Sequence, residues 1–219
     1  SLMFDYEIPP ERIDVLPNPS AIPMDMVPEH LDVKESKRLT QPMRLLFVGR
    51  DGFLKGLDIA VETVQLLNSR GIQAELAVCS RNNVDRPNVR WVGTFTKSDP
   101  AQLQQYVRLY QDAHLLIHPA RYESAGIVPS EAAAFATPTI TNDVGGLSTT
   151  VVDGVSGIVL RAGSPAKSYA EVIAELLNEP ERYYRLCETT RCRYERELNW
   201  SVVGRRFVQI LKTVASEQN

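Results

Sequence analysis

The sequence predicts a single α/β domain built on a doubly wound parallel sheet of about six strands. Its 219 residues suit one large domain at the usual size of about 150 residues, and 43% hydrophobic with 23% charged residues is an ordinary globular composition. Six short apolar runs alternate with helical patterns, which is typical of such a sheet. Because doubly wound sheets bind ligands at the carboxyl ends of their strands, we expect a site in the loops that follow the strands.

The predicted strands are short apolar runs with little polar alternation, as in parallel strands buried on both faces. They are Met43–Gly49, Ala74–Cys79, Val89–Gly93, Leu115–His118, Pro138–Thr141 and Gly157–Leu160. Between them, residues 56–69 and 100–112 carry apolar side chains at helical spacing and are expected to be crossover helices. Two further amphipathic helices are expected over residues 180–198 and 201–215.

Residues 1–42 differ in composition and are expected to form a linker with the remnant of a preceding domain. Seven of the 14 prolines lie within residues 1–43, a density that prevents a long helix or a central strand. The chain begins with Ser1 and Leu2 ahead of Met3, without the basic and apolar leader of a targeting peptide. We therefore expect a piece of a longer protein, with the folded domain spanning residues 43–219.

Charge and cysteine content narrow the function classes. Lys and Arg number 24 and Asp and Glu 27, so the net charge of −3 supplies no overall field for binding nucleic acid. The apolar runs are far shorter than the roughly 18 residues of a membrane span. Membrane association is possible but is not indicated by the sequence. Cys79, Cys187 and Cys192 contain no CxxC pair, which predicts neither a disulfide framework nor a zinc site. We expect a cytoplasmic protein without a metal or cofactor.

The loop after the first predicted strand reads GRDGFLKG, from Gly49 to Gly56, and leads into a helix. Its glycines allow the backbone to approach a ligand, Arg50 and Lys55 supply two cations, and the amides of a helix start lie beside them. These features predict a diphosphate cradle, although the loop is neither a P-loop nor a GxGxxG dinucleotide motif. The alternative is that both cations are solvated loop charges.

Two glutamates follow the fourth predicted strand in RYESAGIVPSEAAA, where a helix is expected from Ser124 or the small residues after it. Glu123 is expected at the rim of the pocket and Glu131 about two turns along the helix, roughly 12 Å away, which suits the two ends of a nucleotide sugar. The amides of residues 126–128 would face an anion. A carboxylate beside a diphosphate makes sense where it accepts hydrogen bonds from sugar hydroxyls. The alternative is a surface charge that compensates the helix dipole.

The segments GRDGFLKG, ESAGIVPSE with its Glu-x7-Glu spacing, and TPTITNDVGG occur in an order that resembles the C-terminal half of a GT-B glycosyltransferase of family 4, also called group 1. The resemblance runs from about Ile8 to the C-terminus. It implies a Rossmann-like domain that binds a nucleotide-sugar donor linked to UDP, GDP or ADP, and a missing N-terminal domain that supplies most of the acceptor site. It also implies transfer of the sugar to an acceptor hydroxyl with retention of configuration, generally without a metal. The chain alone is expected to be inactive.

The same resemblance implies roles for individual residues. Arg50 and Lys55 would grip the donor diphosphate beside Gly49 and, together with Glu123, would carry catalysis. Glu123 would face the sugar, and Glu131 would hold the ribose hydroxyls. The main-chain amides at the donor would come from Gly126, Ile127 and Val128.

Three positions depart from the family pattern and bear on donor preference and activity. Ala125 stands where Phe is frequent, Ala136 where Gly is frequent, and Thr149 where Glu is frequent. His118, at the end of a predicted strand, has two interpretations: a substrate contact or a hydrogen-bonded wall residue. A noncatalytic nucleotide-sugar binding or regulatory module on the same fold is the alternative function from another class, and a hexose epimerase built on two similar domains is a further rival.

Overall fold

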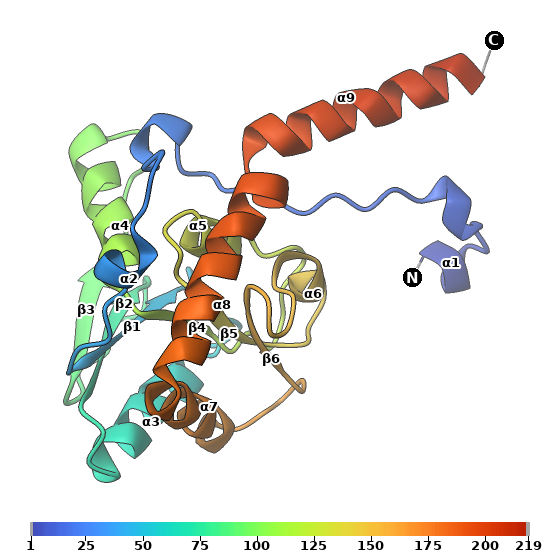
Figure 1. Ribbon diagram of the computed structural model, residues 1–219. Coiled ribbons are helices and arrows are strands. Elements are labelled where there is room, and N and C mark those ends of the chain that lie inside the picture. The colour runs from blue at the N-terminus through green and yellow to red at the C-terminus, as the bar shows by residue number, and fades with distance from the viewer. Residues whose placement is uncertain (1, 218–219) are drawn as a thin grey trace.

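A computed structural model describes residues 2–217 and shows one six-stranded, all-parallel sheet in the order β3-β2-β1-β4-β5-β6 (Figure 1). The strands are β1 Met43–Val48, β2 Ala74–Cys79, β3 Val89–Gly93, β4 Leu115–His118, β5 Thr139–Asn142 and β6 Gly157–Leu160. The chain builds one half of the sheet from β1 outward to β3, crosses to β4, and builds the other half outward to β6. This is the doubly wound, Rossmann-like sheet that the sequence predicted.

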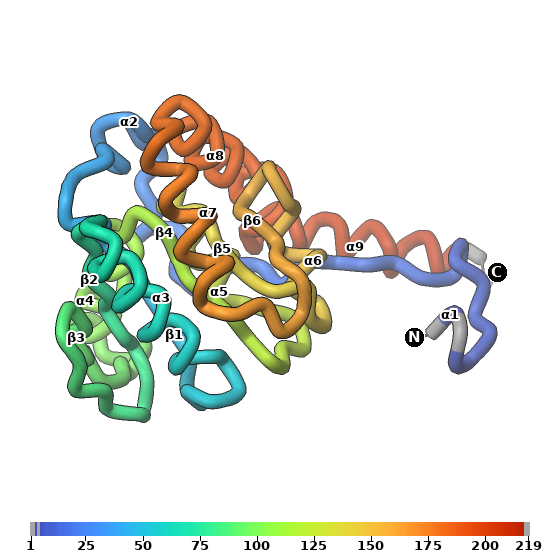
Figure 2. Tube along the Cα trace, turned by 90° about the horizontal axis from the view of Figure 1, so that it is seen from below, coloured from blue at the N-terminus to red at the C-terminus, as the bar shows by residue number. Residues whose placement is uncertain are grey.

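Helices cover both faces of the sheet, and each face has its own apolar core (Figure 2). On one face, α3 (Leu57–Ser69), α7 (Ala166–Asn178) and part of α8 (Pro180–Arg193) pack on the side chains of Met43, Leu45 and Phe47. On the other face, α4 (Pro100–Asp112) and α5 (Ile127–Ala133) pack on Leu46 and Val48. Alternate β1 side chains thus enter opposite cores, which explains why the strand is apolar throughout.

Most of the expected elements are present, and α7 is the longest helix that the structure adds among the described residues. The helix α7 was not predicted, although Tyr169, Ala170, Ile173 and Leu176 are buried at helical spacing along it. The helix predicted over residues 180–198 ends as α8 at Arg193 and continues as a single π-helical turn over 194–198, before α9 (Trp200–Glu217) begins.

The N-terminal segment is irregular and returns to the domain before β1. Residues 2–42 contain the short helices α1 (Leu2–Asp5) and α2 (Val33–Ser36) and two 3-10 turns, over residues 10–12 and 24–26. Lys37 lies buried after α2, where its Nζ donates to the carbonyls of Tyr110, Gln111 and Ala113 at 2.8, 2.9 and 2.8 Å. Burial lowers the pKa of Lys37 to about 7, while three acceptors match the three N–H groups of an ammonium. This side chain ties the segment to the carboxyl end of α4.

The terminal helix α9 and the first residues of the chain extend away from the sheet in the same direction (Figures 1 and 2). Its side chains of Phe207, Val208, Leu211 and Val214 are each about half exposed. Within the described residues, no helix has the length and apolar character that crossing a bilayer requires.

The strand order reverses between β1 and β4, which are hydrogen-bonded neighbours at the centre of the sheet. In doubly wound sheets this switch point opens a crevice at the carboxyl ends of the two strands. The loops that leave β1 at Val48 and β4 at His118 flank that point. They are the GRDGFLKG loop and the loop that carries Glu123.

Candidate functional site

The loop after β1 is folded tightly against the loop after β4. Asp51 Oδ1 accepts a hydrogen bond from the Leu54 amide at 2.9 Å, which fixes the turn. Gly56 then adopts a left-handed φ of 74°, and a Cβ atom at this position would lie 2.1 Å from the carbonyl oxygen of Pro119. Only glycine meets both demands, because the conformation and the close backbone approach both disfavour a side chain. This approach brings the Lys55 side chain over the residues that follow β4.

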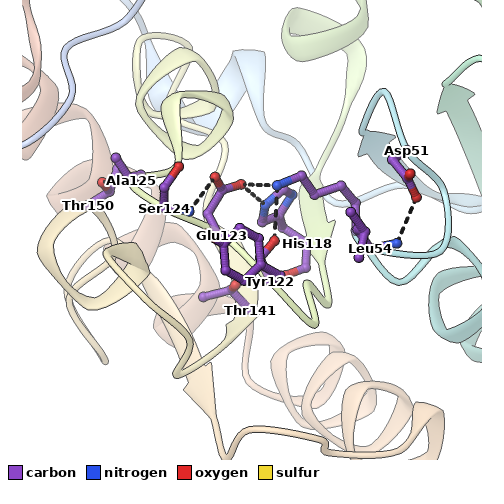
Figure 3. A network of polar contacts seen from close by, with 10 residues as sticks. Asp51, Leu54, His118, Tyr122, Glu123, Ser124, Ala125, Thr141 and Thr150 are labelled. Atoms are coloured by element: carbon purple, nitrogen blue, oxygen red, sulfur yellow. Dashed lines mark hydrogen bonds and ion pairs between the residues drawn. The ribbon is translucent and has the colours of Figure 1, made fainter.

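Lys55, Glu123 and His118 form the polar centre of the site, and Figure 3 shows the side chains of Glu123 and His118 side by side. Lys55 Nζ lies 2.9 Å from Glu123 Oε2 and donates to the carbonyl of Tyr122 at 3.1 Å. His118 Nε2 lies 3.2 Å from the same Oε2, and Glu123 Oε1 accepts from the Ser124 amide at 3.1 Å. Both the Lys55 and the Glu123 side chains are largely buried but still reach the surface. The sequence prediction that a cation of the first loop and a carboxylate of the second converge thus agrees with the geometry.

The contacts of Glu123 determine its protonation. Burial by itself raises the pKa of the Glu123 carboxyl, but the hydrogen bonds from His118 and Lys55 and the charges on those side chains outweigh it and bring the pKa to about 2. Glu123 is therefore a carboxylate at neutral pH. The other ring nitrogen of His118, Nδ1, is buried and has no hydrogen-bond partner among the described residues.

The loop that carries Glu123 is held from behind by the turn that follows β5. A Cβ atom on Gly145 (φ 57°) would lie 1.7 Å from the carbonyl oxygen of Glu123, and the Gly146 amide donates to the carbonyl of Ser124 at 3.1 Å. Thr150, at the end of α6 (Leu147–Thr150), donates through its hydroxyl to the carbonyl of Ala125 at 2.9 Å. The third Gly-rich segment of the sequence thus packs against the backbone of the second.

A buried arginine anchors α6 in turn. Arg193 of α8 is 7% exposed and donates through Nη1 to the carbonyl of Thr150 at 2.8 Å and through Nη2 to that of Thr149 at 2.6 Å. Nη1 also reaches Ser156 Oγ at 3.0 Å. Charge-assisted hydrogen bonds of this kind are the stronger class, so the terminal helices help to fix the position of the Glu123 loop.

Glu131 is fully buried and lies in a separate cluster. Its Oε1 accepts from Lys97 Nζ at 2.5 Å, and its Oε2 accepts from the hydroxyls of Tyr106 and Tyr110 at 2.6 and 2.7 Å. The two hydroxyls lie 2.7 Å apart. Burial and the charge of Glu131 raise the pKa of both tyrosines well above the ordinary value of 10. No described contact joins this cluster to Lys55.

The helix α5 begins at the far end of the range expected for its start. It starts at Ile127, with Gly126 as its N-cap in a left-handed conformation (φ 69°). The prediction that Glu131 lies two turns along the helix was therefore wrong, and it lies about one turn from the start. The expected amides of Gly126, Ile127 and Val128 do belong to this helix start.

The remaining predicted cradle residues, Gly49 and Arg50, are positioned by the end of β1. A Cβ atom on Gly49 would lie 2.8 Å from Cβ of Lys55, so the glycine lets the loop close. Arg50 is exposed and has no hydrogen bond or ion pair to the residues that the structure describes. Its role therefore stays a prediction.

Several residues of the site were not singled out from sequence. Lys97, Tyr106 and Arg193 were not predicted as site residues. Two tyrosines one helical turn apart on the buried face of α4 were a usable signal, because buried tyrosine hydroxyls need a polar partner. His118, left open between two interpretations, contacts Glu123. Ala136 has φ 54°, a backbone conformation that explains why its family counterparts favour glycine.

Other ligand-binding features are few in the described part of the chain. No group of three or more His, Cys, Asp or Glu side chains among residues 2–217 could hold a metal ion. A surface cavity of about 530 Å³ lies beside the first loop, between α3 and the loop after β2, and contains Phe53, Val61 and Asn83 in its lining. It includes neither Lys55 nor Glu123.

Comparison with known proteins gives a consistent set of matches. The family described as glycosyl transferases group 1 matches residues 30–193. A curated relative from Thermobispora bispora, D-inositol 3-phosphate glycosyltransferase, is 30% identical over 94% of this chain and 51% of the relative. The chain therefore spans about half the length of that relative.

Solved structures share the fold. Sucrose-phosphate synthase from Thermosynechococcus elongatus aligns with a TM-score of 0.70 at 21% identity, covering 93% of this chain and 53% of that chain. WaaG, a glycosyltransferase involved in lipopolysaccharide biosynthesis, aligns with a TM-score of 0.67 at 25% identity, covering 93% of this chain and 58% of that chain. In each case about half of the larger protein corresponds to the present fold.

Proposed function

The chain belongs to the group 1 glycosyl transferases, and from this premise we propose that it is the nucleotide-sugar donor domain of a retaining enzyme. The donor is a sugar linked to UDP, GDP or ADP, and the product is a glycoside on an acceptor hydroxyl. The observation that carries the proposal is the contact between Lys55 and Glu123 at 2.9 Å, made at the switch point where such sheets bind ligands.

Lys55 and Glu123 act on different halves of the donor, Lys55 on the diphosphate and Glu123 on the sugar. The diphosphate that leaves gains negative charge as the bond to the sugar breaks, and cations placed beside it stabilise that charge. Lys55 supplies one ammonium, the exposed Arg50 supplies a guanidinium, and the amides of Gly126, Ile127 and Val128 add donors. Charge-assisted hydrogen bonds contribute about 1.5 to 3 kcal/mol each.

Glu123 is suited to accepting hydrogen bonds from sugar hydroxyls because it stays ionised. Its Oε2 is occupied by Lys55 and His118, whereas Oε1 accepts one backbone amide and has capacity for a further donor. A hydroxyl of the sugar fits that acceptor. Glu131, on the neighbouring helix start, would accept from the ribose.

The acceptor half lies in the part of the protein outside this chain. Phe207, Leu211 and Val214 lie at i, i+4 and i+7 on one face of α9 and are each about half exposed. The helix itself projects from the domain (Figure 1). We expect this face to pack on the protein's own N-terminal domain, which supplies the acceptor site. The isolated chain should therefore bind the donor but turn it over poorly. We also expect the enzyme to be cytoplasmic.

Calorimetric titration of the chain with uridine, guanosine and adenosine diphosphates tests the proposal. One of the three should bind, and Lys55→Met and Arg50→Ala should each weaken that binding by about tenfold or more. Lys167→Met on α7 and Arg108→Ala on α4, both at exposed positions, are matched controls and should leave the affinity unchanged. Equal affinity in the wild type and in both variants would show that Lys55 and Arg50 do not bind the diphosphate.

The alternative is a noncatalytic nucleotide-sugar binding module. Thr149, which stands where the family often has a carboxylate, is the feature that favours it. The full-length protein separates the two functions. An enzyme transfers the sugar or slowly hydrolyses the donor, and a binding module does neither.

A further inference from the structure

Glu131 cannot meet a ligand in the arrangement that the structure shows. Its side chain is 0% exposed, and its partners Tyr106 and Tyr110 are buried as well. Lys97 is the partner with solvent access, at 40% exposure. Its ammonium also lies 4.7 Å from the ring centroid of Tyr106. Any group that approaches Glu131 from solvent must therefore move Lys97.

The two carboxylate oxygens of Glu131 differ in whether their hydrogen-bond donors can be replaced by a ligand. Oε2 accepts from two phenol hydroxyls that sit on the buried face of α4 and cannot leave without unpacking the helix. Oε1 accepts from Lys97, whose long stem is flexible and reaches the surface from the loop before α4. Tyr106 and Tyr110 thus orient Glu131 so that only Oε1 is open to exchange.

We propose that Lys97 is an exchangeable counter-ion that a hydroxyl of the bound nucleotide's ribose must displace from Glu131, which makes Lys97 a specificity-determining residue for the sugar of the nucleotide. The inference rests on the proposed function, in which a nucleoside diphosphate binds beside α5. A ligand with ribose hydroxyls replaces one donor on Oε1 with another. A ligand without them leaves the Lys97–Glu131 pair in place.

The exchange has a measurable signature. In the wild type, the gain from the ribose hydroxyls is reduced by the loss of the Lys97 contact, so a ribonucleotide and its dideoxy analogue differ only moderately in affinity. Without the ammonium, Oε1 is a buried acceptor that lacks a donor until a hydroxyl arrives. The affinity difference between the two ligands should then increase.

The test is calorimetric titration at pH 8 with the tightest-binding of UDP, GDP and ADP and with its 2′,3′-dideoxy form. Lys97→Met keeps the stem over Tyr106 and removes the charge, and the ratio of the two affinities should rise by about tenfold over the wild type. Lys97→Arg retains a cation and should keep the wild-type ratio. Lys167→Met, exposed on α7, is the control for loss of a surface charge. If Lys97→Met does not fold, Lys97→Gln, with a neutral and weaker donor, should raise the ratio by a smaller factor.

The outcomes distinguish a failure of the Lys97 exchange from a failure of the proposed function. A ratio that is unchanged or lower in Lys97→Met overturns the exchange, and a lower ratio together with weaker ribonucleotide binding would mean that Lys97 holds the ribose directly. Failure of all three diphosphates to bind the wild type would instead contradict the proposed function.

Discussion

Replacement of Glu123 by glutamine should remove a pH-dependent part of the protein's stability. The carboxylate is held ionised by Lys55 and His118, which bring its pKa from the ordinary 4.5 to about 2. A depressed pKa means that the unfolded chain takes up the proton at higher pH than the folded chain. The stabilisation is therefore fully present above about pH 4.5 and is lost as the pH falls through about 2.

The magnitude follows from the two pKa values. At 1.36 kcal/mol per pH unit, a fall from 4.5 to about 2 corresponds to roughly 3 kcal/mol of folding free energy. Glu123→Gln keeps the shape of the side chain and removes its charge, so it should cost up to about 3 kcal/mol at pH 7 and less than about 1 kcal/mol near pH 2.

Urea denaturation of the wild type and Glu123→Gln at a series of pH values from 7 to 2.5 measures this difference. The gap between the two unfolding free energies should narrow as the pH falls. Glu188→Gln, at an exposed position on α8, is the control and should show a gap near zero throughout. A gap for Glu123→Gln that stays constant from pH 7 to 2.5 would refute the assignment of Glu123 as the charged partner of Lys55 and His118.

Two further substitutions test how the site is supported. Gly145→Ala places a methyl group against the carbonyl of Glu123 in a left-handed conformation and should destabilise the fold by about 2 kcal/mol or more, with weaker diphosphate binding. The comparison is with Gly163→Ala, which has a similar φ of 75° and open space around it; equal effects in the two variants would show that the close approach to Glu123 does not matter. Lys37→Met removes the ammonium donor from three carbonyls at the end of α4, of which that of Tyr110 keeps the Thr137 hydroxyl as a donor. It should cost about 3 kcal/mol or more in urea denaturation, whereas Lys34→Met on the exposed side of α2 should cost less than about 0.5 kcal/mol. A loss below about 1 kcal/mol for Lys37→Met would contradict its role as the cap of α4.

The central strands of the sheet could be predicted from sequence because they are buried on both faces. Runs such as Leu115–His118 carry no competing pattern, and their bounds follow from the apolar residues alone. The helix α7 could also have been predicted, since Tyr169, Ile173 and Leu176 recur at helical spacing. The meeting of Lys55 and Glu123 was predictable in outline, because both follow strands whose carboxyl ends share one edge of the sheet.

The surroundings of Glu131 could not be predicted in the same way. Lys97 and Glu131 are 34 positions apart, and their contact depends on where the loop after β3 places Lys97 relative to α5. The start of α5 is likewise set by the left-handed turn at Gly126 rather than by the helix propensity of Ser124 and Ala125. Side-chain partners between elements follow from loop geometry, which residue patterns describe poorly.

A crystal structure of this chain with the nucleoside diphosphate that binds it most tightly would show whether the ligand reaches both Lys55 and Glu131. We expect a diphosphate oxygen within hydrogen-bond distance of Lys55 Nζ and a ribose hydroxyl at Glu131 Oε1, with the ammonium of Lys97 moved away. A nucleotide bound instead in the surface cavity beside Val61 and Asn83, with its diphosphate out of reach of Lys55, would contradict this expectation.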